Sequence, residues 1–484
     1  MLLIIGLILL FLVIIATISS RFNVPLIILA LAIGIIFGSD VTGIIYFDDA
    51  VLAQQLANIA LIFILFAAGF GTKNYHFKQV IRPTTLLATV GVLLTANIAA
   101  MLFCLLTGWT FLKSLLLCAI VSSTDAAAVF SILRTRSINR NIASITEIES
   151  ATNDPMAIIS TTFILQLIIG AETRTYIPAL MFIWHLLGGA GIGILVGIIG
   201  SAIFNRIKNI DVGYFYVCLI GLILLSFGLA DFCEASGMLS AFFAGYIMGN
   251  KKLPFKNGIS SFTETQSFIA NVGLFILLGL LVFPRHFSAI WLFGIAIFLL
   301  VTFVGRPLAV FLCTLFAKIT FKEKVFLSWS GIRGAVPIVL ATYPAAAGID
   351  PEHEIFNIVF FAVTLSILVQ GTTIGKLADL LKLSARRPSK PKQTMELVTI
   401  HETNYELIDI FIDDEMYQGE SRISDMTLPA GTTITMVNRD NQIIAPSGST
   451  LVLPGDTLSV LVDKDEVEEV TVAILRMFSN RNDS

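Results

Sequence analysis

Long apolar runs, separated by short polar stretches, fill residues 1–384 of the sequence. A helix that crosses a bilayer needs about 20 mostly apolar residues, and most of the runs are close to this length. They predict about thirteen transmembrane helices, near residues 1–20, 24–39, 51–71, 83–108, 112–133, 142–170, 183–204, 212–230, 235–250, 265–283, 287–315, 325–347 and 353–380. The pattern is typical of a polytopic α-helical membrane protein, and we assign residues 1–384 to a transmembrane domain.

The pattern changes after residue 384. A basic, proline-rich stretch, "ARRPSKPKQT", occupies residues 385–394 and predicts a linker that lies close to anionic lipid headgroups. From residue 395 on, short runs of alternating polar and apolar residues are separated by turn formers such as the "PGD" at 454–456. A helical pattern, "DEVEEVTVAILRMF", follows the last of these runs. We therefore predict a small α+β domain over residues 395–484.

Composition and charge support this division. The chain is 56% hydrophobic and 13% charged, about half of the roughly 25% charged residues of an ordinary soluble domain. Lysine and arginine gather in alternate loops, with fifteen in the loops on the side of the C-terminal domain and three on the other side. The positive-inside rule then places the N-terminus outside and the C-terminal domain in the cytoplasm.

One predicted span carries carboxylates within its apolar length, in the stretch "EIESATNDP" at residues 147–155. An ionisable group at bilayer depth is costly and marks a functional pathway by default. In a helix the oxygen-bearing side chains form two neighbouring stripes over about two turns. The first stripe consists of Glu147, Ser150 and Asp154, and the second of Glu149 and Asn153. Such a set of oxygens suits a hard monovalent cation.

Two other spans carry polar or helix-breaking residues at depth. Thr124 and Asp125 lie among small residues in the fifth predicted span, and Gly331 and Gly334 interrupt the twelfth around Arg333. Interrupted spans at matching places in two halves are typical of inverted-repeat transporters with a site at the midplane. The sequence therefore predicts crossed, broken helices.

Arg333 needs a partner at that depth, and Glu149 and Glu147 are the candidates. We expect a structural ion pair between Arg333 and Glu149. A carboxylate that is paired with arginine stays ionised, which leaves Asp154 as the group that exchanges protons. Structural alternatives remain for the neighbouring charges. Asp125 could cap a broken helix, Glu147 could reach toward water, and Arg306 could form an ion pair or bind a lipid headgroup.

Four motifs together resemble one known family of transporters. They are "STDAAAVFSIL" at 123–133, "EIESATNDPMAI" at 147–158, "FVGRPLAVF" at 303–311 and "SGIRGAVPIVLA" at 330–341. In this order they resemble the cation:proton antiporter-1 class, and within it the bacterial potassium/proton antiporters of the NhaP, or cell-volume regulation protein A, type. Residues 436–461 resemble the C-terminal part of a regulator-of-potassium-conductance module.

The resemblance implies a secondary antiporter that works by alternating access, with Asp154 as the shared site of a proton or a monovalent cation. It implies that the cation lies between Asp154 and Asp125, and that Asn153, Thr124, Glu149 and Ser150 complete its surroundings. Arg333 resembles the arginine that holds the glutamate. The Asn-Asp pair implies electroneutral, one-for-one exchange, and the preference for potassium rests on the resemblance alone.

The family further implies a homodimer in the bacterial inner membrane. We expect no cofactor and no nucleic-acid partner, and we expect the C-terminal domain to regulate transport, with a nucleotide as its candidate ligand. A cation channel gated by this domain would also need buried acids, but it would conduct current. An intramembrane aspartyl protease would use two membrane aspartates, but the chain lacks a "GxGD" motif at either acid and that function gives Asn153 and Arg333 no role.

Overall fold

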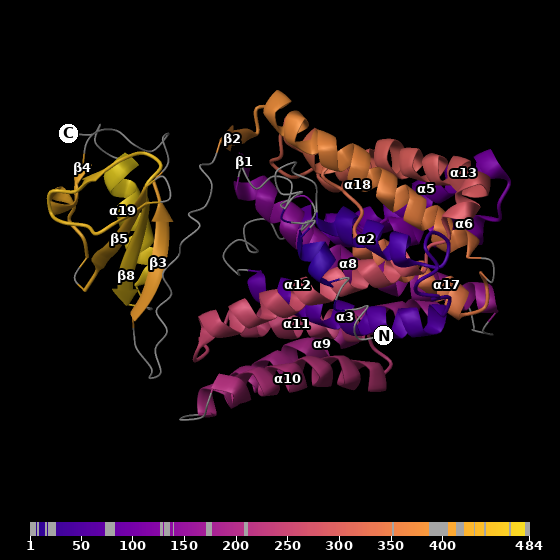
Figure 1. Cartoon of the computed structure of the whole chain (residues 1–484), viewed down its shortest axis with the longest axis horizontal. Coiled ribbons are helices and arrows are strands. Elements are labelled where there is room, and N and C mark those ends of the chain that lie inside the picture. The colour runs from indigo at the N-terminus through magenta and orange to yellow at the C-terminus, as the bar shows by residue number, and fades with distance from the viewer. Residues whose placement is uncertain are drawn as a thin grey trace. The chain divides into compact units, whose positions relative to one another are not determined.

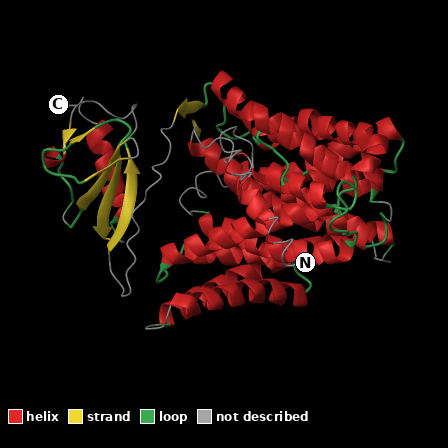
Figure 2. Ribbon diagram, in the orientation of Figure 1, coloured by secondary structure: helices red, strands yellow, loops and turns green. Residues whose placement is uncertain are grey.

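The computed structural model describes most of the chain. The chain folds into two compact units, Met1–Ala385 and Arg386–Ser484. The first unit is almost entirely helical, and the second is built around strands (Figure 2). The described residues are 6, 9–14, 17, 26–72, 83–125, 129, 136–138, 140–170, 177–207, 212–350, 353–386, 405–412, 421–429, 431–439, 442–463 and 466–479.

Within these residues, eight helices are long and apolar enough to cross a membrane. They are Ala50–Gly71, Pro83–Thr107, Ile142–Ile169, Leu180–Arg206, Val212–Phe232, Gly258–Leu280, Ile290–Cys313 and Glu354–Leu380. Four shorter apolar helices are Ile28–Phe37, Phe111–Val121, Gly237–Gly249 and Ala335–Ala346. The fold is that of a polytopic helical membrane protein. The count of thirteen stays a prediction, because the first predicted span falls largely outside the described residues.

The early helices of the first unit and those between residues 177 and 280 pack as one group (Figure 1), and glycines bring several of them into close contact. A Cβ atom on Gly279 would lie 2.5 Å from the carbonyl oxygen of Leu31, and one on Gly245 would lie 2.2 Å from that of Phe66. Small residues let helix backbones approach closely in a membrane. The group contains α2 (Leu26–Phe37), α3 (Ala50–Gly71), α9 (Ile177–Arg206), α10 (Val212–Phe232), α11 (Gly237–Gly249) and α12 (Lys256–Leu280).

The remaining helices of the first unit form a second group, which contains the residues of the predicted site. Two π-helical turns, η2 (Leu87–Gly91) and η4 (Leu300–Gly305), lie within its long spans. Its α-helices are α5 (Val92–Thr107), α6 (Phe111–Val121), α8 (Arg140–Ile169), α13 (Phe287–Leu299), α14 (Arg306–Cys313), α15 (Phe321–Trp329), α16 (Ala335–Leu340), α17 (Thr342–Ala346) and α18 (Glu354–Leu380). Two short strands, β1 (Arg136–Ile138) and β2 (Ser384–Arg386), pair with each other.

Two spans of the second group are broken at the places where glycine and small residues predicted it. Helix α6 ends at Val121, and residues 123–125 are not helical. Residues 331–334, between α15 and α16, are not helical either. The backbone N–H of Asp125 donates to the carbonyl oxygen of Ile332 at 2.7 Å. The two breaks therefore meet, as the predicted fold class requires.

The second unit contains a four-stranded antiparallel sheet in the order β3-β8-β5-β6. A buried carboxylate fixes one of its turns, because Asp456 accepts from Arg439 at 2.8 Å and from the backbone N–H of Leu453 at 2.8 Å. The arrangement is a small α+β unit with an apolar core of its own. Its elements are β3 (Tyr405–Phe411), β4 (Ser421–Arg422), β5 (Thr433–Arg439), β6 (Gln442–Ile444), β7 (Leu451–Val452), β8 (Thr457–Asp463) and α19 (Val467–Ser479).

We predict that Gly279→Ala lowers the melting temperature of the purified protein by several degrees. The added methyl group would push α12 away from α2, and overpacking of this kind costs about 1–3 kcal/mol. Thermal unfolding in detergent micelles measures the effect. Gly273→Ala is the matched control, because a Cβ atom at Gly273, in the same helix, meets nothing within 4 Å. Equal melting temperatures of the two variants would contradict the close contact.

Candidate functional site

The site lies where α8 passes the two chain breaks. Helix α8 carries Glu149, Ser150, Asn153 and Asp154, and it continues through Pro155 to Ile169 without interruption. Thr124 and Asp125 lie in the break after α6. The structure therefore brings together all six residues that the sequence predicts around the cation. Four of the six are buried, and the two aspartates, Asp125 and Asp154, are partly exposed.

Buried polar side chains on α8 hold the break at Thr124 in place. Asn153 donates through Nδ2 to the Thr124 hydroxyl at 2.6 Å, and its Oδ1 accepts from the Thr124 backbone N–H at 3.4 Å. The Ser150 hydroxyl donates to the Thr124 carbonyl oxygen. Backbone groups that leave a helix in a membrane need such partners, since lipid offers none. Asn153 and Ser150 thus give the interrupted helix a defined position against α8.

Asp125 and Asp154 lie beside Thr124, Ser150 and Asn153, and their side chains are less buried than those three. Asp154 accepts a hydrogen bond at 2.6 Å from the hydroxyl of Ser123, and Asp125 is close enough to Asp154 for their charges to repel. Asp125 also packs tightly against Gly334, where a Cβ atom would lie 2.1 Å from its Oδ2. Two neighbouring carboxylates at bilayer depth favour a bound cation or proton, because either one relieves the repulsion.

The predicted ion pair between Arg333 and Glu149 is wrong. Glu149, which is 1% exposed, instead forms two parallel hydrogen bonds with Arg306, one of them from Nη2 at 2.9 Å. Arg306 also donates to the carbonyl oxygen of Leu327 at 3.3 Å. The physical reason is the bidentate fit, since Arg306 begins α14 beside α8 and presents its planar guanidinium to the carboxylate.

Arg333 has a different set of partners. Its Nη1 donates to the carbonyl oxygens of Ser122 and Ser123 at 2.7 and 2.9 Å. The last carbonyls of a helix lack donors from within it and attract positive charge, and these two carbonyls directly follow the end of α6. Arg333 therefore joins one chain break to the other, and Arg306 takes the role that the sequence assigned to Arg333.

Side chains of α18 hold the backbone at Arg333 and Trp329 through hydrogen bonds. The backbone N–H of Arg333 donates to the Ser366 hydroxyl at 3.1 Å, and that hydroxyl donates to Gln370 Oε1. Gln370 in turn donates to the Trp329 carbonyl oxygen at 3.0 Å. Sequence analysis did not single out Ser366, Gln370 or Ser123, because hydroxyl and amide residues are common in these spans and only their positions in the fold distinguish them.

The structure also bears on two of the neighbouring charges, Arg306 and Glu147. Arg306 forms a buried ion pair, the structural role that the sequence allowed for it. Glu147 is exposed on α8, whereas Glu149 two residues later is buried. This exposure agrees with the alternative that Glu147 reaches toward water.

The chain matches a family model described as "Sodium/hydrogen exchanger, transmembrane" over residues 7–379. It is 33% identical over 465 residues to the K(+)/H(+) antiporter NhaP2 of Shewanella oneidensis, a match that covers 95% of this chain and 80% of that protein. It is 31% identical over 482 residues to the K(+)/H(+) antiporter NhaP of Alkalimonas amylolytica, with 99% and 84% covered.

A solved structure is also similar to this one. The sodium proton antiporter MjNhaP1 of Methanocaldococcus jannaschii aligns with a TM-score of 0.68 at 27% sequence identity. The alignment covers 78% of this chain and 97% of that one.

We predict that the melting temperature distinguishes the two arginines as partners of Glu149. Arg306→Gln leaves a buried carboxylate unpaired, a change that costs about 3–5 kcal/mol. Adding Glu149→Gln to Arg306→Gln should recover much of that loss, because the unpaired charge is then gone. Adding Glu149→Gln to Arg333→Gln should instead lower the melting temperature further. Recovery with Arg333→Gln and none with Arg306→Gln would reverse the assignment.

Proposed function

Because the chain belongs to the sodium/hydrogen exchanger family, we propose that its site exchanges a monovalent cation for a proton at Asp154. The protein is a multi-pass membrane transporter and not an enzyme, and cation/proton antiport is the activity of its relatives and of this chain. The observation that carries the proposal is the position of Asp154, which contacts Ser123 and faces the charge of Asp125 where the broken helices meet.

Competition for one carboxylate couples the two fluxes. Glu149 is neutralised by Arg306, and Asn153 is uncharged and bound to Thr124, so neither takes up a proton in exchange for a cation. Asp154 is then the group on α8 that accepts either ion, with Asp125 as the second carboxylate around the cation. Moving an ionised carboxylate across the barrier costs several kcal/mol, so only the occupied, neutral site changes sides.

Alternating access requires the site to face the two sides in turn. The breaks, α8 and their supporting helices form one packed group, and the glycine-packed group of α2, α3 and α9–α12 lies beside it. In the proposed mechanism the first group moves against the second and carries the site with it. No ATP and no cofactor enters this scheme, because the proton and cation gradients drive each other.

Potassium is the proposed cation, with sodium as the alternative. Relatives at 31–33% identity are named as K(+)/H(+) antiporters, and one at 29% identity as a Na(+)/H(+) antiporter. The pairing of Asp154 with Asn153, in place of a second aspartate, supports one-for-one, electroneutral exchange. The rival function, a gated cation channel, would need the same acids but not a competition between proton and cation.

The charge pattern and the family resemblance support a membrane location, an orientation and an oligomeric state for the protein. We place it in the bacterial inner membrane as a homodimer, with the N-terminus outside and the second unit in the cytoplasm. Residues 1–384 form the exchanger domain in this proposal, residues 385–394 a basic linker, and residues 395–484 a regulatory domain that resembles a regulator-of-potassium-conductance module. A nucleotide is the candidate ligand of that domain.

We predict that Asp154→Asn abolishes exchange, because an amide takes up neither a proton nor the charge of a cation. Acridine-dye dequenching in inverted vesicles, on addition of potassium and then of sodium, measures the exchange. Asp231→Asn is the matched control, since Asp231 is an exposed residue of α10 and should leave the signal unchanged. Dequenching by Asp154→Asn at the level of the native chain would refute the shared site.

We predict that a chain ending at residue 385 retains exchange but responds differently to cation concentration and pH. The cut falls at the boundary between the two units, so the helical site stays intact while the proposed regulator is lost. The cation concentration for half-maximal dequenching, measured at several pH values, tests this. Identical curves for the two chains would show that the second unit does not regulate transport.

A further inference from the structure

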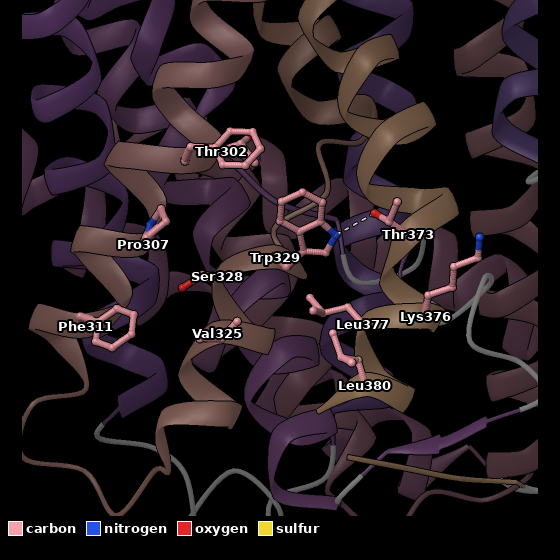
Figure 3. Close-up of a pocket in the computed structure, with 11 residues that line it drawn as sticks. Thr302, Pro307, Phe311, Val325, Ser328, Trp329, Thr373, Lys376, Leu377 and Leu380 are labelled. Carbon is pink, nitrogen blue, oxygen red and sulfur yellow. Dashed lines mark hydrogen bonds between the residues drawn. The ribbon is translucent and has the colours of Figure 1, made fainter. Parts of the chain in front are cut away.

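An apolar groove opens on the helical unit away from the cluster around Asp154. It has a volume of about 480 Å³, and α14, α15 and α18 form its walls together with η4 (Figure 3). Its lining consists of Thr302, Phe303, Pro307, Phe311, Val325, Ser328, Trp329, Thr373, Lys376, Leu377 and Leu380. Within this lining, the Trp329 indole donates to the Thr373 hydroxyl at 2.9 Å.

The groove is open on the surface of the helical unit, between Ile290–Cys313 and Glu354–Leu380, two helices long and apolar enough to cross a membrane. Phe303 and Leu380 in its lining are 53% and 78% exposed, and an exposed apolar face of such helices meets lipid in a bilayer. A flexible chain of methylene groups matches such a surface, since the lining offers almost no polar group that is not already bonded. Acyl chains of a phospholipid have this chemistry.

Charge complements the apolar lining at one end. Lys376 contributes its stem to the groove, and its ammonium group points away from the apolar side chains (Figure 3). Among the described residues Lys376 has no ion-pair partner. The chain around this end is basic, with five lysines and two acids in residues 318–324 and 376–382. One of these acids, Glu323, is engaged in capping α15.

The groove also borders the groups that support the site. Pro307 follows Arg306, which pairs with Glu149. Trp329 lines the groove with its side chain, while its carbonyl oxygen accepts from Gln370 in the chain of hydrogen bonds that leads to Arg333. A molecule bound in the groove would therefore contact Pro307, next to Arg306, and Trp329, whose carbonyl oxygen belongs to the chain of hydrogen bonds to Arg333.

We propose that the groove is a binding site for an anionic phospholipid of the cytoplasmic leaflet. One acyl chain lies against Phe303, Trp329 and Leu377, and the phosphate lies beside Lys376, one turn before α18 ends. Basic pockets between transmembrane helices on the cytoplasmic side bind acidic headgroups in this way. The binding site is separate from cation exchange at Asp154, and binding can be measured without transport.

Trp329 offers a local probe of occupancy in the full-length protein. In a chain with Trp109, Trp184 and Trp291 replaced by phenylalanine, lipids with brominated acyl chains quench Trp329 when they fill the groove. Unchanged cation exchange would first show that this chain is intact. Competition between brominated phosphatidylcholine and unlabelled phosphatidylglycerol then gives the relative affinity of the anionic lipid.

We expect phosphatidylglycerol to bind about fivefold more tightly than phosphatidylcholine, the factor that one lysine near an anionic surface supplies. Lys376→Gln should remove this preference, and Lys376→Arg should keep it. Lys251→Gln, in an exposed turn between α11 and α12 that does not line the groove, should leave it unchanged. Val325→Phe should reduce quenching by both lipids, because the larger ring fills the groove.

Three results would overturn the proposal. Equal affinity of the two lipids in the native groove would mean that ordinary bulk lipid covers it. A preference that survives Lys376→Gln would place the headgroup elsewhere. No quenching of Trp329 by either lipid would mean that another surface, such as a second copy of the chain, covers the groove.

Discussion

The structure depends on the way two interrupted helices satisfy each other's backbone inside the membrane. A break in a transmembrane helix exposes N–H and carbonyl groups that lipid cannot bind. Here the Asp125 N–H donates to the Ile332 carbonyl oxygen, and Arg333 covers the carbonyls of Ser122 and Ser123. The break that carries Asp125 is thereby fixed beside α8, where Ser123 bonds to Asp154 and Thr124 to Asn153.

Each of the two buried arginines stabilises a different part of this arrangement. Arg306 neutralises Glu149, and Arg333 binds backbone carbonyls at the end of α6. Since an unpaired buried charge is far more costly than a paired one, these partners keep Glu149 and the breaks in a single state. Asp154 differs from Glu149 because its hydrogen-bond donor, the Ser123 hydroxyl, is neutral. In the proposed exchange, a proton or a cation neutralises its charge.

The sequence predicts most of the spans and both breaks, because span length and glycine placement are local properties of the chain. Asp154, Asn153 and Asp125 could also be found locally, as acids and amides inside apolar runs. The partner of Glu149 could not. Arg306 and Arg333 both lie at depth, and the choice between them depends on how α14 and the second break pack against α8. Ser123 was equally hidden among small residues, and only its hydrogen bond to Asp154 distinguishes it.

We propose that a cation and a proton exclude each other at Asp154. Proton release on cation binding tests it most directly, by calorimetric titration of the purified protein with potassium in buffers of different ionisation enthalpy. If the two ions compete for this carboxylate, about one proton leaves for each cation bound near the working pH, and Asp154→Asn releases none. Potassium binding by the native chain without proton release would contradict it.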